Sequence, residues 1–105
     1  MLESTYDACM FYEMTEAGLH IEHQVRLPVI YRHIQLPCAY RADFIVENCL
    51  IVEIKAVEKL LPVHTAQLLS YLKISRLKLG LLLNFNVVHM RDGILRRING
   101  PESEL

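Results

Sequence analysis

Two carboxylates and one amine, Asp43, Glu53 and Lys55, interrupt two short apolar runs of the kind that form buried strands. A structural role alone does not account for them, because Val or Thr at positions 43 and 53 would give a more stable sheet. Two carboxylates, water and a substrate phosphate suit Mg²⁺ or Mn²⁺, which prefer oxygen ligands, whereas zinc would need more Cys or His nearby. We therefore expect a divalent-cation site here. The alternative is a solvent-facing strand surface in which Arg41 and Lys55 neutralise the carboxylates.

The hairpin that joins these two runs decides whether the carboxylates meet. If residues 47–49 form its loop, Asp43 lies directly opposite Glu53 in the antiparallel ladder. This loop also segregates the side chains: one face carries Arg41, Asp43, Ile45, Ile51, Glu53 and Lys55, and the other carries Ala42, Phe44, Val46, Leu50, Val52 and Ile54. A two-residue loop would mix polar and apolar side chains on both faces, so a three-residue loop, or a five-residue loop of the same parity, is favoured. Like charges so placed repel, and a shared proton, the neighbouring Lys55 and Arg41, or a divalent cation must offset the repulsion.

The apolar periodicity predicts one domain with the order α-β-β-β-α-β. Helical spacing covers residues 2–17 and 63–75, and strand patterns cover residues 20–31, 33–46, 49–57 and 78–86, with a hairpin arm or short strand at residues 88–98 around Asp92-Gly93. A chain of 105 residues fits a single domain, which we place at residues 1–98, followed by a flexible polar tail at residues 99–105.

The second predicted helix carries a polar stripe formed by His64, Gln67 and Tyr71, three and four residues apart. The opposite, apolar stripe comprises Val63, Ala66, Leu69 and Leu72, with Leu68 beside it. We expect the apolar stripe to face the core and the polar stripe to overlook the carboxylates. An ordinary exposed helix face is the alternative.

Charge and composition narrow the class of protein. The formal net charge of −1 argues against binding nucleic acid by bulk charge alone. The charge is uneven, however, because residues 73–97 hold six basic residues and one acidic residue. We interpret this either as a solvated basic face or as a phosphate-contacting surface at the C-terminal end. The candidate nucleic-acid contacts are Arg41, Lys73, Arg76, Arg91, Arg96 and Arg97.

The cysteines and histidines point away from a disulfide framework or a zinc site. Cys9, Cys38 and Cys49 are odd in number and have no CxxC spacing, which indicates reduced thiols in a cytoplasmic protein. His20 and His23, three apart in a predicted strand, face opposite sides and are interpreted as structural. No signal peptide is evident, and no apolar run approaches the ~20 residues of a membrane-spanning helix, so no membrane contact is predicted.

The ordered set of chemical residues resembles the PD-(D/E)XK nuclease superfamily. It comprises Asp43, then Glu53-Ile54-Lys55 on the next strand, then Gln67 and Tyr71 on the following helix. The Gln-x-x-x-Tyr element is similar to that of the RecB-like branch. An isolated Glu-x-Lys occurs often by chance, whereas the whole ordered set is specific.

The resemblance is closer still to the small proteins of the GxxExxY family, and it covers nearly the whole chain. Glu3 and Tyr6 in "MLESTY" meet the family's name motif. The Gly of that motif would lie just before Met1, and the helix that usually precedes it is absent, which suggests a late start site or a truncated chain. Ala42 takes the place of the Pro that often precedes the Asp.

The resemblance implies an α/β fold of mixed α+β type, with a restriction-endonuclease-like core in which helices flank a central mixed β-sheet. It also implies that Asp43 and Glu53 hold Mg²⁺ or Mn²⁺, with the backbone carbonyl of Ile54 as an extra ligand. Lys55 would orient or activate the attacking water and stabilise the developing charge. The implied function is metal-dependent hydrolysis of nucleic-acid phosphodiester bonds, with DNA favoured over RNA.

The same resemblance gives three further residues supporting roles. Glu3 would act through a metal-bound water, and Gln67 and Tyr71 would position the substrate or the catalytic lysine.

Two other functions remain open alongside the nuclease. The first is a non-catalytic module on the same fold that binds nucleic acid or a protein through its basic residues. The second is a structural dimer, suggested by the apolar positions Val87, Val88, Met90, Ile94 and Leu95. A homodimer is compatible with the nuclease, and we predict one.

Overall fold

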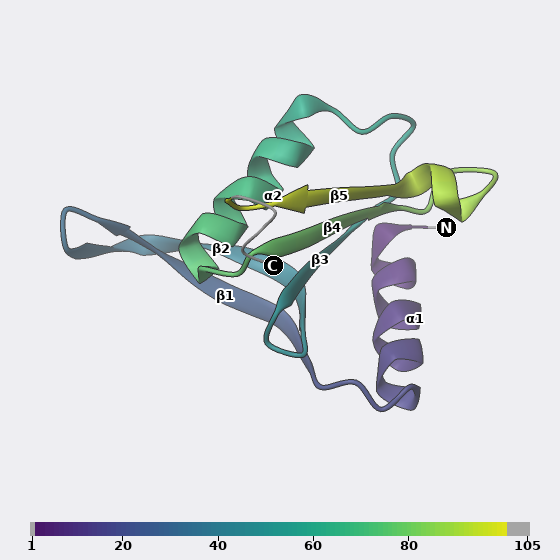
Figure 1. Ribbon diagram of the computed structural model, residues 1–105, viewed down its shortest axis with the longest axis horizontal. Coiled ribbons are helices and arrows are strands. Elements are labelled where there is room, and N and C mark those ends of the chain that lie inside the picture. The colour runs from purple at the N-terminus through teal and green to yellow at the C-terminus, as the bar shows by residue number, and fades with distance from the viewer. Residues whose placement is uncertain (1, 101–105) are drawn as a thin grey trace.

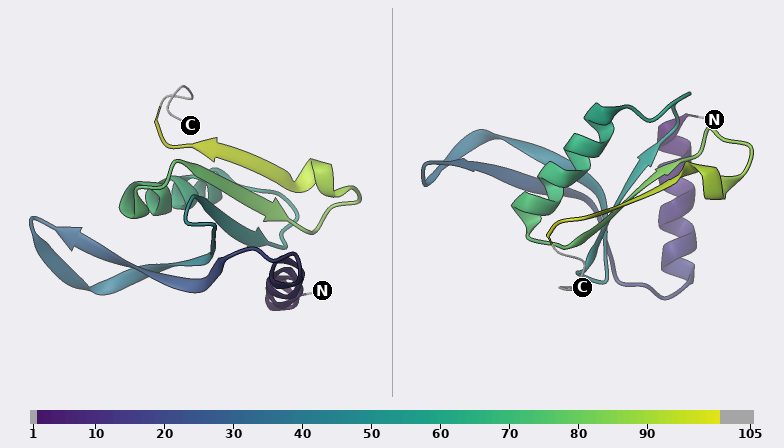
Figure 2. Two further views of the ribbon diagram at one scale, coloured as in Figure 1. Left: turned by 60° about the horizontal axis from the view of Figure 1, so that its bottom comes forward. Right: turned by 45° about the horizontal axis from the view of Figure 1, so that its top comes forward.

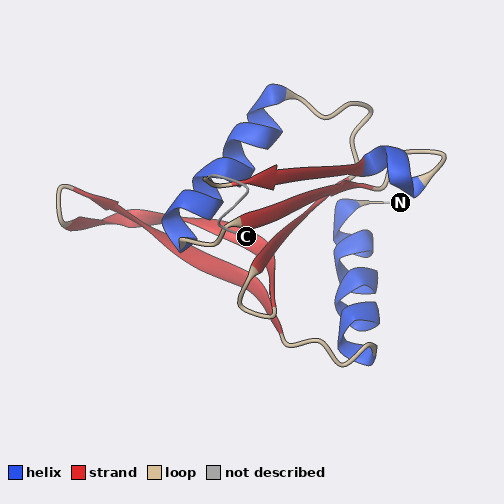
Figure 3. Ribbon diagram, viewed as in Figure 1, coloured by secondary structure: helices blue, strands red, loops and turns tan. Residues whose placement is uncertain are grey.

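A five-stranded mixed sheet forms the centre of the molecule, and helices pack on both of its faces (Figure 1). The computed structural model describes residues 2–100, apart from the side chain of Cys38. Across the sheet the strands follow the chain order: β1 (Ile21–Tyr31), β2 (Ile34–Val46), β3 (Leu50–Lys55), β4 (Leu79–Asn84) and β5 (Ile94–Ile98). The helices are α1 (Glu3–Glu16), α2 (Pro62–Ser75) and the short 3₁₀ helix η1 (Met90–Gly93). The strands are antiparallel to their neighbours except β3 and β4, which are parallel and joined through α2 (Figure 3).

The predicted elements are confirmed to within a few residues, with two differences near the C-terminus. Asp92 and Gly93 lie in η1 rather than in a hairpin turn, and only residues 94–98 form the last strand. Asn99, which we placed in the tail, donates from its backbone N–H to the carbonyl of Lys78 at 2.8 Å. The rest of the predicted flexible tail, residues 101–105, lies outside the described residues.

Both faces of the sheet are buried, including the face that carries the predicted polar residues. Ile45 and Ile51 pack beneath α2 with Leu82, in the first core cluster. Phe44 and Ile54 pack on the opposite side with Met14 of α1, in the second cluster. The carboxylates of β2 and β3 therefore lie inside a three-layered structure and not on a solvent-facing strand surface.

Helix α2 packs on β4 through a close approach at Gly80. A Cβ atom at this position would lie 2.7 Å from Leu68 Cδ1, so the glycine lets the helix settle directly on the strand. The buried stripe of α2 is Leu68, Tyr71 and Leu72. Val63, which we assigned to the core stripe, is exposed, and Tyr71, which we assigned to the polar stripe, is buried.

The β1–β2 ladder is interrupted where Gln24 lies opposite Asp43. His23 pairs with Phe44 and Val25 pairs with Ala42, but Gln24 and Asp43 between them are not paired. Gln24 also has a positive φ of 54°. Phe44 belongs to the cluster on the α1 side, whereas Ala42 belongs to the cluster beneath α2. Alternate residues of a regular strand share a face. The buried side chains of β2 therefore change from the α1 side of the sheet to the α2 side at this point. The prediction that Ala42 shares a face with Phe44 is therefore wrong.

Beyond the interruption, β1 and β2 continue as a two-stranded arm, which we define as residues 25–42. These strands have 11 and 13 residues, whereas the other three have five or six. The arm projects from the body of the sheet in every view and ends in the turn at Arg32-His33 (Figures 1 and 2).

Candidate functional site

The β2–β3 hairpin brings the two predicted carboxylates together. Val46 pairs with Leu50 across a loop of residues 47–49, which confirms the three-residue loop. The β2–β3 ladder ends at the pair Phe44 and Val52. At the next position, hydrogen bonds from backbone N–H groups to side-chain carboxylates replace the bonds between backbone groups. The N–H of Asp43 donates to Glu53 Oε1 at 2.7 Å, and the N–H of Ile54 donates to Asp43 Oδ2 at 2.7 Å. The two carboxylates thus bridge the strands where regular pairing stops.

Burial sets the electrostatics of this pair. Glu53 is only 2 % exposed, and burial, followed by the charge of Asp43, raises the pKa of Glu53 to about 8. Burial also raises the pKa of Asp43, and the charge of Asp7 adds to this, while the N–H of Ile54 opposes it. Among the described residues, neither carboxylate forms an ion pair with Arg41 or Lys55. The alternative of a solvent-facing, salt-bridged strand surface therefore does not fit, and the pair favours neutralisation by a proton or a cation.

Helix α2 places two of its predicted site residues over the carboxylates. Gln67 Oε1 accepts a hydrogen bond from Lys55 Nζ at 3.4 Å, which ties the amine to the helix. Tyr71 is buried, with its ring centroid 5.5 Å from that of Tyr40. Burial, followed by the charges of Glu53 and Asp43, raises the pKa of Tyr71 to about 12, so its hydroxyl stays protonated at neutral pH.

His64, the third member of the predicted polar stripe, has a local role instead. Its Nδ1 accepts a hydrogen bond from the backbone N–H of Leu61 at 2.9 Å, which caps the start of α2. The prediction that it overlooks the carboxylates is not supported.

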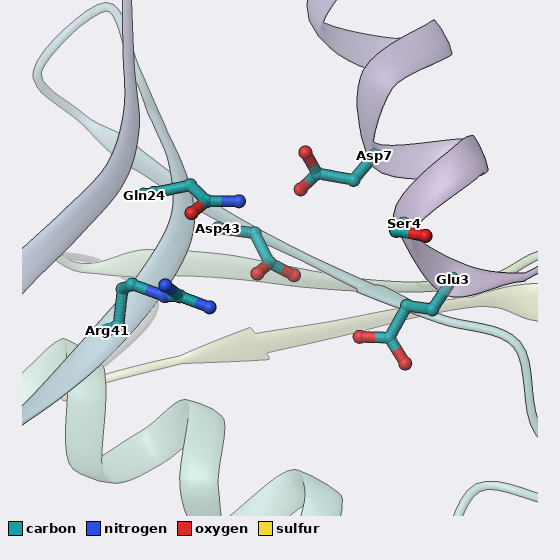
Figure 4. A pocket seen from close by; sticks show the side chains of 6 residues that line it. All are labelled: Glu3, Ser4, Asp7, Gln24, Arg41 and Asp43. Atoms are coloured by element: carbon teal, nitrogen blue, oxygen red, sulfur yellow. The ribbon is translucent and has the colours of Figure 1, made fainter.

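A cleft of about 230 Å³ opens between α1 and the interruption in the β1–β2 ladder (Figure 4). Its lining residues are Glu3, Ser4 and Asp7 from α1, Gln24 from β1, and Arg41 and Asp43 from β2. In Figure 4 the carboxylates of Glu3 and Asp7 point from the helix into the cleft, toward the wall that carries Asp43. Glu3, predicted to act from the first helix, is therefore placed at the same site as Asp43. Its charge contributes to raising the pKa of Glu53.

Asp7 and Gln24 are candidate site residues that we did not single out from the sequence. Asp7 is buried, and its Oδ1 lies 2.6 Å from His23 Nε2. A signal for Asp7 existed, because it follows Glu3 by four residues and therefore shares its helix face. Gln24 had no such signal, since its position depends on the positive φ at the ladder interruption.

His23 is the residue that anchors α1 beside the site, consistent with the structural role we predicted. Its ring stacks between those of Phe11 and Phe44, at centroid distances of 4.7 and 4.6 Å. Together with the contact to Asp7, this fixes the wall of the cleft that α1 forms.

The predicted nucleic-acid contacts are distributed over several parts of the molecule. Arg41 lines the cleft, Lys73 and Arg76 line a hollow between α2 and β1, and Arg97 lines another hollow between α2 and β5. Arg91 lies on η1, at the opposite end of the molecule from the arm (Figure 1), and Arg96 lies on β5. These residues lie on β2, near the end of α2, on η1 and on β5, and a phosphate-contacting surface formed by them stays a prediction.

The donor atoms of the site fit a hard divalent cation in kind. Asp43 and Glu53 offer carboxylate oxygens, and each has a second oxygen beyond the one used to bridge the strands. A cation there would offset the burial that raises both pKa values. Among residues 2–100 no group of three or more His, Cys, Asp or Glu side chains is arranged to hold a metal ion. The side chains would therefore supply two ligands, with backbone carbonyl and water completing the shell, as Mg²⁺ tolerates.

Comparison with known proteins agrees with this architecture. The mixed sheet flanked by helices is a restriction-endonuclease-like core, and the crystal structure of SSO0001 has the same fold, with a TM-score of 0.71 over 96 % of this chain at 18 % sequence identity. The chain spans about half of SSO0001, 52 % of its length. A family model described as the PD-(D/E)XK nuclease superfamily matches residues 1–98, and the chain belongs to this superfamily. A search of curated proteins finds no match. Within the described part of the chain, no helix is long and apolar enough to span a membrane.

Proposed function

We propose that this protein is a metal-dependent phosphodiesterase that hydrolyses nucleic acid, with DNA favoured over RNA. The observation that carries the proposal is the pair Asp43 and Glu53, joined through backbone N–H groups at the end of a ladder, with Lys55 held beside them by Gln67. Mg²⁺ or Mn²⁺ would be held by the two carboxylates and the backbone carbonyl of Ile54. When bound, the ion would supply Lewis acidity to the scissile phosphate.

The residues of this chain would position the reactants. Lys55 is fixed on the α2 side of the sheet by its bond to Gln67. From there its ammonium would donate to the attacking water and stabilise the negative charge that develops on the phosphate. Glu3, on the α1 wall of the cleft, would orient water on the other side of Asp43. The protonated hydroxyl of Tyr71 would donate to substrate or help to place the lysine.

We further propose that the chain belongs to the GxxExxY family within the superfamily. Two observations support separate roles for the two motif residues. Glu3 points into the cleft, whereas Tyr6 stacks on Phe85 at a centroid distance of 4.6 Å. The tyrosine would thus fix the helix at the segment after β4 while the glutamate serves the site.

A nuclease assay tests the proposed function. The wild-type protein, Lys55→Ala and the control Lys59→Ala are incubated with double- and single-stranded DNA and RNA in Mg²⁺ or Mn²⁺. We expect the wild type and Lys59→Ala to cleave and Lys55→Ala to lose at least about a hundredfold in rate, as when a group that stabilises transition-state charge is removed. Lys59 lies exposed on the loop between β3 and α2. Lys59→Ala therefore removes the same charge as Lys55→Ala but at a position outside the site. Equal cleavage by all three proteins would refute the assigned role of Lys55.

A non-catalytic binding module is the second candidate, and the sparse ligand set favours it. Two side-chain carboxylates, one of them with a pKa near 8, form a weak cation site unless water and substrate complete it. Calorimetric titration with Mn²⁺ separates the two candidates. No heat of binding at millimolar metal, with or without DNA, would support the binding module.

We also propose that the protein forms a homodimer. Val88 and Ile94 are exposed large apolar residues near the edge strand β5, whereas Met90 and Leu95 pack against the core. Light scattering tests this proposal, and a strict monomer at high concentration would refute it.

A further inference from the structure

The arm has a charge pattern unlike that of the rest of the chain. From residue 25 to residue 42 the sequence contains three arginines, one histidine and no Asp or Glu, although the whole chain carries a net charge of −1. The arginines are Arg26, Arg32 and Arg41. A projecting, purely basic segment on a nearly neutral protein is an electrostatic footprint for a polyanion.

Two of these arginines are placed directly against one another. Arg26 and Arg41 are Cα partners across the β1–β2 ladder, and both are exposed. Like charges directly opposite each other destabilise a strand pair. Among the described residues neither forms an ion pair, although the charge of Arg41 acts on Asp43 in the cleft and opposes the rise in its pKa that burial causes. Because Arg41 also lines the cleft with Asp43, a basic track begins at the candidate active site and continues onto the arm.

The turn at the tip of the arm contains residues that are less favourable in this conformation than the usual turn residues. Arg32 and His33 form a two-residue turn with φ values of 49° and 68°, and Tyr31 pairs with Ile34 across it. Turns with two positive φ values strongly prefer Asn-Gly, because larger side chains are strained in this conformation. The turn therefore carries an arginine and a histidine where stability alone favours small residues, which indicates a binding role for their side chains.

The same tip exposes large side chains to solvent. Ile30, Tyr31 and Ile34 are 66 %, 57 % and 63 % exposed, and the Arg32 guanidinium lies 5.4 Å from the centroid of the Tyr31 ring. Apolar and aromatic groups beside exposed cations suit a surface that offers both phosphates and base edges.

We propose that the arm is a duplex-DNA-binding ribbon that lies in the major groove and contacts the phosphate backbone through Arg26 and Arg32. This inference rests on the proposed nuclease function for the direction of the duplex, which would run from the cleft along the arm. The major groove of B-DNA admits a two-stranded β-ribbon, whereas the deep, narrow major groove of A-form RNA does not. Arg26 and Arg32 are six positions apart, at most about 20 Å or roughly six base pairs, and the ladder between them contains a register shift between Pro28 and Ile30.

The salt dependence of binding tests the proposal directly. Affinity for a fluorescent DNA duplex of about 30 base pairs is measured by anisotropy in EDTA, between about 50 and 200 mM salt, so that cleavage plays no part. Arg26→Gln/Arg32→Gln removes two phosphate contacts, and the slope of log K against log salt concentration should become shallower by about 1.8. At about 0.1 M salt this corresponds to a loss of roughly sixtyfold in affinity. The control Lys59→Gln, which removes an exposed positive charge away from the arm, should leave the slope unchanged.

A second variant separates binding from folding. Arg32→Asn/His33→Gly installs the preferred turn residues, so it should raise the thermal midpoint while weakening duplex binding. The wild type should also bind the DNA duplex more tightly than an RNA duplex of the same sequence.

The proposal is overturned if the wild type does not bind the DNA duplex, if it binds the RNA duplex equally well, or if the arginine variants keep both affinity and slope. It is also overturned if those variants bind DNA normally but change a dimer into a monomer in light scattering, because the arm would then bind a second copy of the chain. Arm-dependent binding without cleavage in Mg²⁺ would support the arm and refute the nuclease. Cleavage at the same rate by the wild type and the arm variants would support the nuclease and refute the arm.

Discussion

Replacing Glu53 by Gln should make the protein more stable at alkaline pH while abolishing its proposed activity. Glu53 is almost completely buried and accepts a hydrogen bond from the Asp43 N–H through Oε1. A glutamine keeps this acceptor and resembles the protonated acid in shape, but it can never become charged. The substitution therefore removes the cost of burying a charge and the repulsion between that charge and Asp43.

The size and sign of the effect follow from the shifted pKa. Burial raises the pKa of Glu53 from 4.5 to about 8. In this interval the folded protein holds a proton that the unfolded chain has released, so stability is fully present below pH 4.5 and declines as the pH rises to 8. At about 1.4 kcal/mol per pKa unit, the decline amounts to roughly 5 kcal/mol. This is comparable with the whole stability of many small domains, which is about 5–15 kcal/mol.

Urea unfolding at several pH values, in EDTA, measures this difference. The free energy of unfolding of Glu53→Gln should exceed that of the wild type by roughly 5 kcal/mol at pH 8, and the two should converge near pH 4.5. Glu58→Gln makes the same chemical change at an exposed loop position and should follow the wild-type curve. With Mn²⁺ in place of EDTA, the wild type at pH 8 should gain more stability than Glu53→Gln, because the variant has lost one of the two carboxylate ligands. A wild-type stability that is flat between these pH values would refute the reasoning.

Two further substitutions test the packing that positions the site. Gly80→Ala brings a Cβ to 2.7 Å from Leu68 Cδ1, so it should lower the free energy of unfolding by about 1–3 kcal/mol, and Leu68→Ala should cost less in its background than alone. Purely additive losses in urea unfolding would contradict this contact. Asn84→Ala removes hydrogen bonds to the N–H and carbonyl of Val57, and should cost about 2–4 kcal/mol by the same measurement. The exposed Asn86 is the matched control, and an equal loss in Asn86→Ala would contradict the role of Asn84.

The meeting of the two carboxylates could be predicted because it depends on parity alone. Polar and apolar residues segregate only if the hairpin loop has an odd length, and this one requirement brings Asp43 to Glu53. The structure has that loop and that encounter. The burial of Glu53 could not be derived in the same way. It depends on how closely α2 packs on this face, and although we expected that helix above the carboxylates, the sequence of β3 does not show how completely it buries them.

The approach of α1 to the site was harder to predict for a similar reason. Glu3 was placed only through the resemblance to a family, and Asp7 was not identified. Both lie in a helix whose periodicity shows which side is apolar, but not which strand it packs against. That packing is fixed by His23, whose stacking between Phe11 and Phe44 links residues from three separate elements. Contacts of this kind arise only in the folded chain.

The interruption of the β1–β2 ladder at Gln24 and Asp43 is a feature of the site that the sequence pattern does not predict. Reading a strand from sequence assumes a regular alternation, and the site lies where alternation fails: Gln24 adopts a positive φ, and the ladder omits its pairing with Asp43. An uninterrupted ladder would engage the backbone of Asp43 in regular pairing, whereas here its N–H binds Glu53 and its carboxylate binds the N–H of Ile54. The same interruption turns the hairpin's apolar face toward α2 and aims the arm away from the sheet. The irregularity that the sequence pattern does not predict therefore lies where Asp43, the cleft and the base of the arm meet.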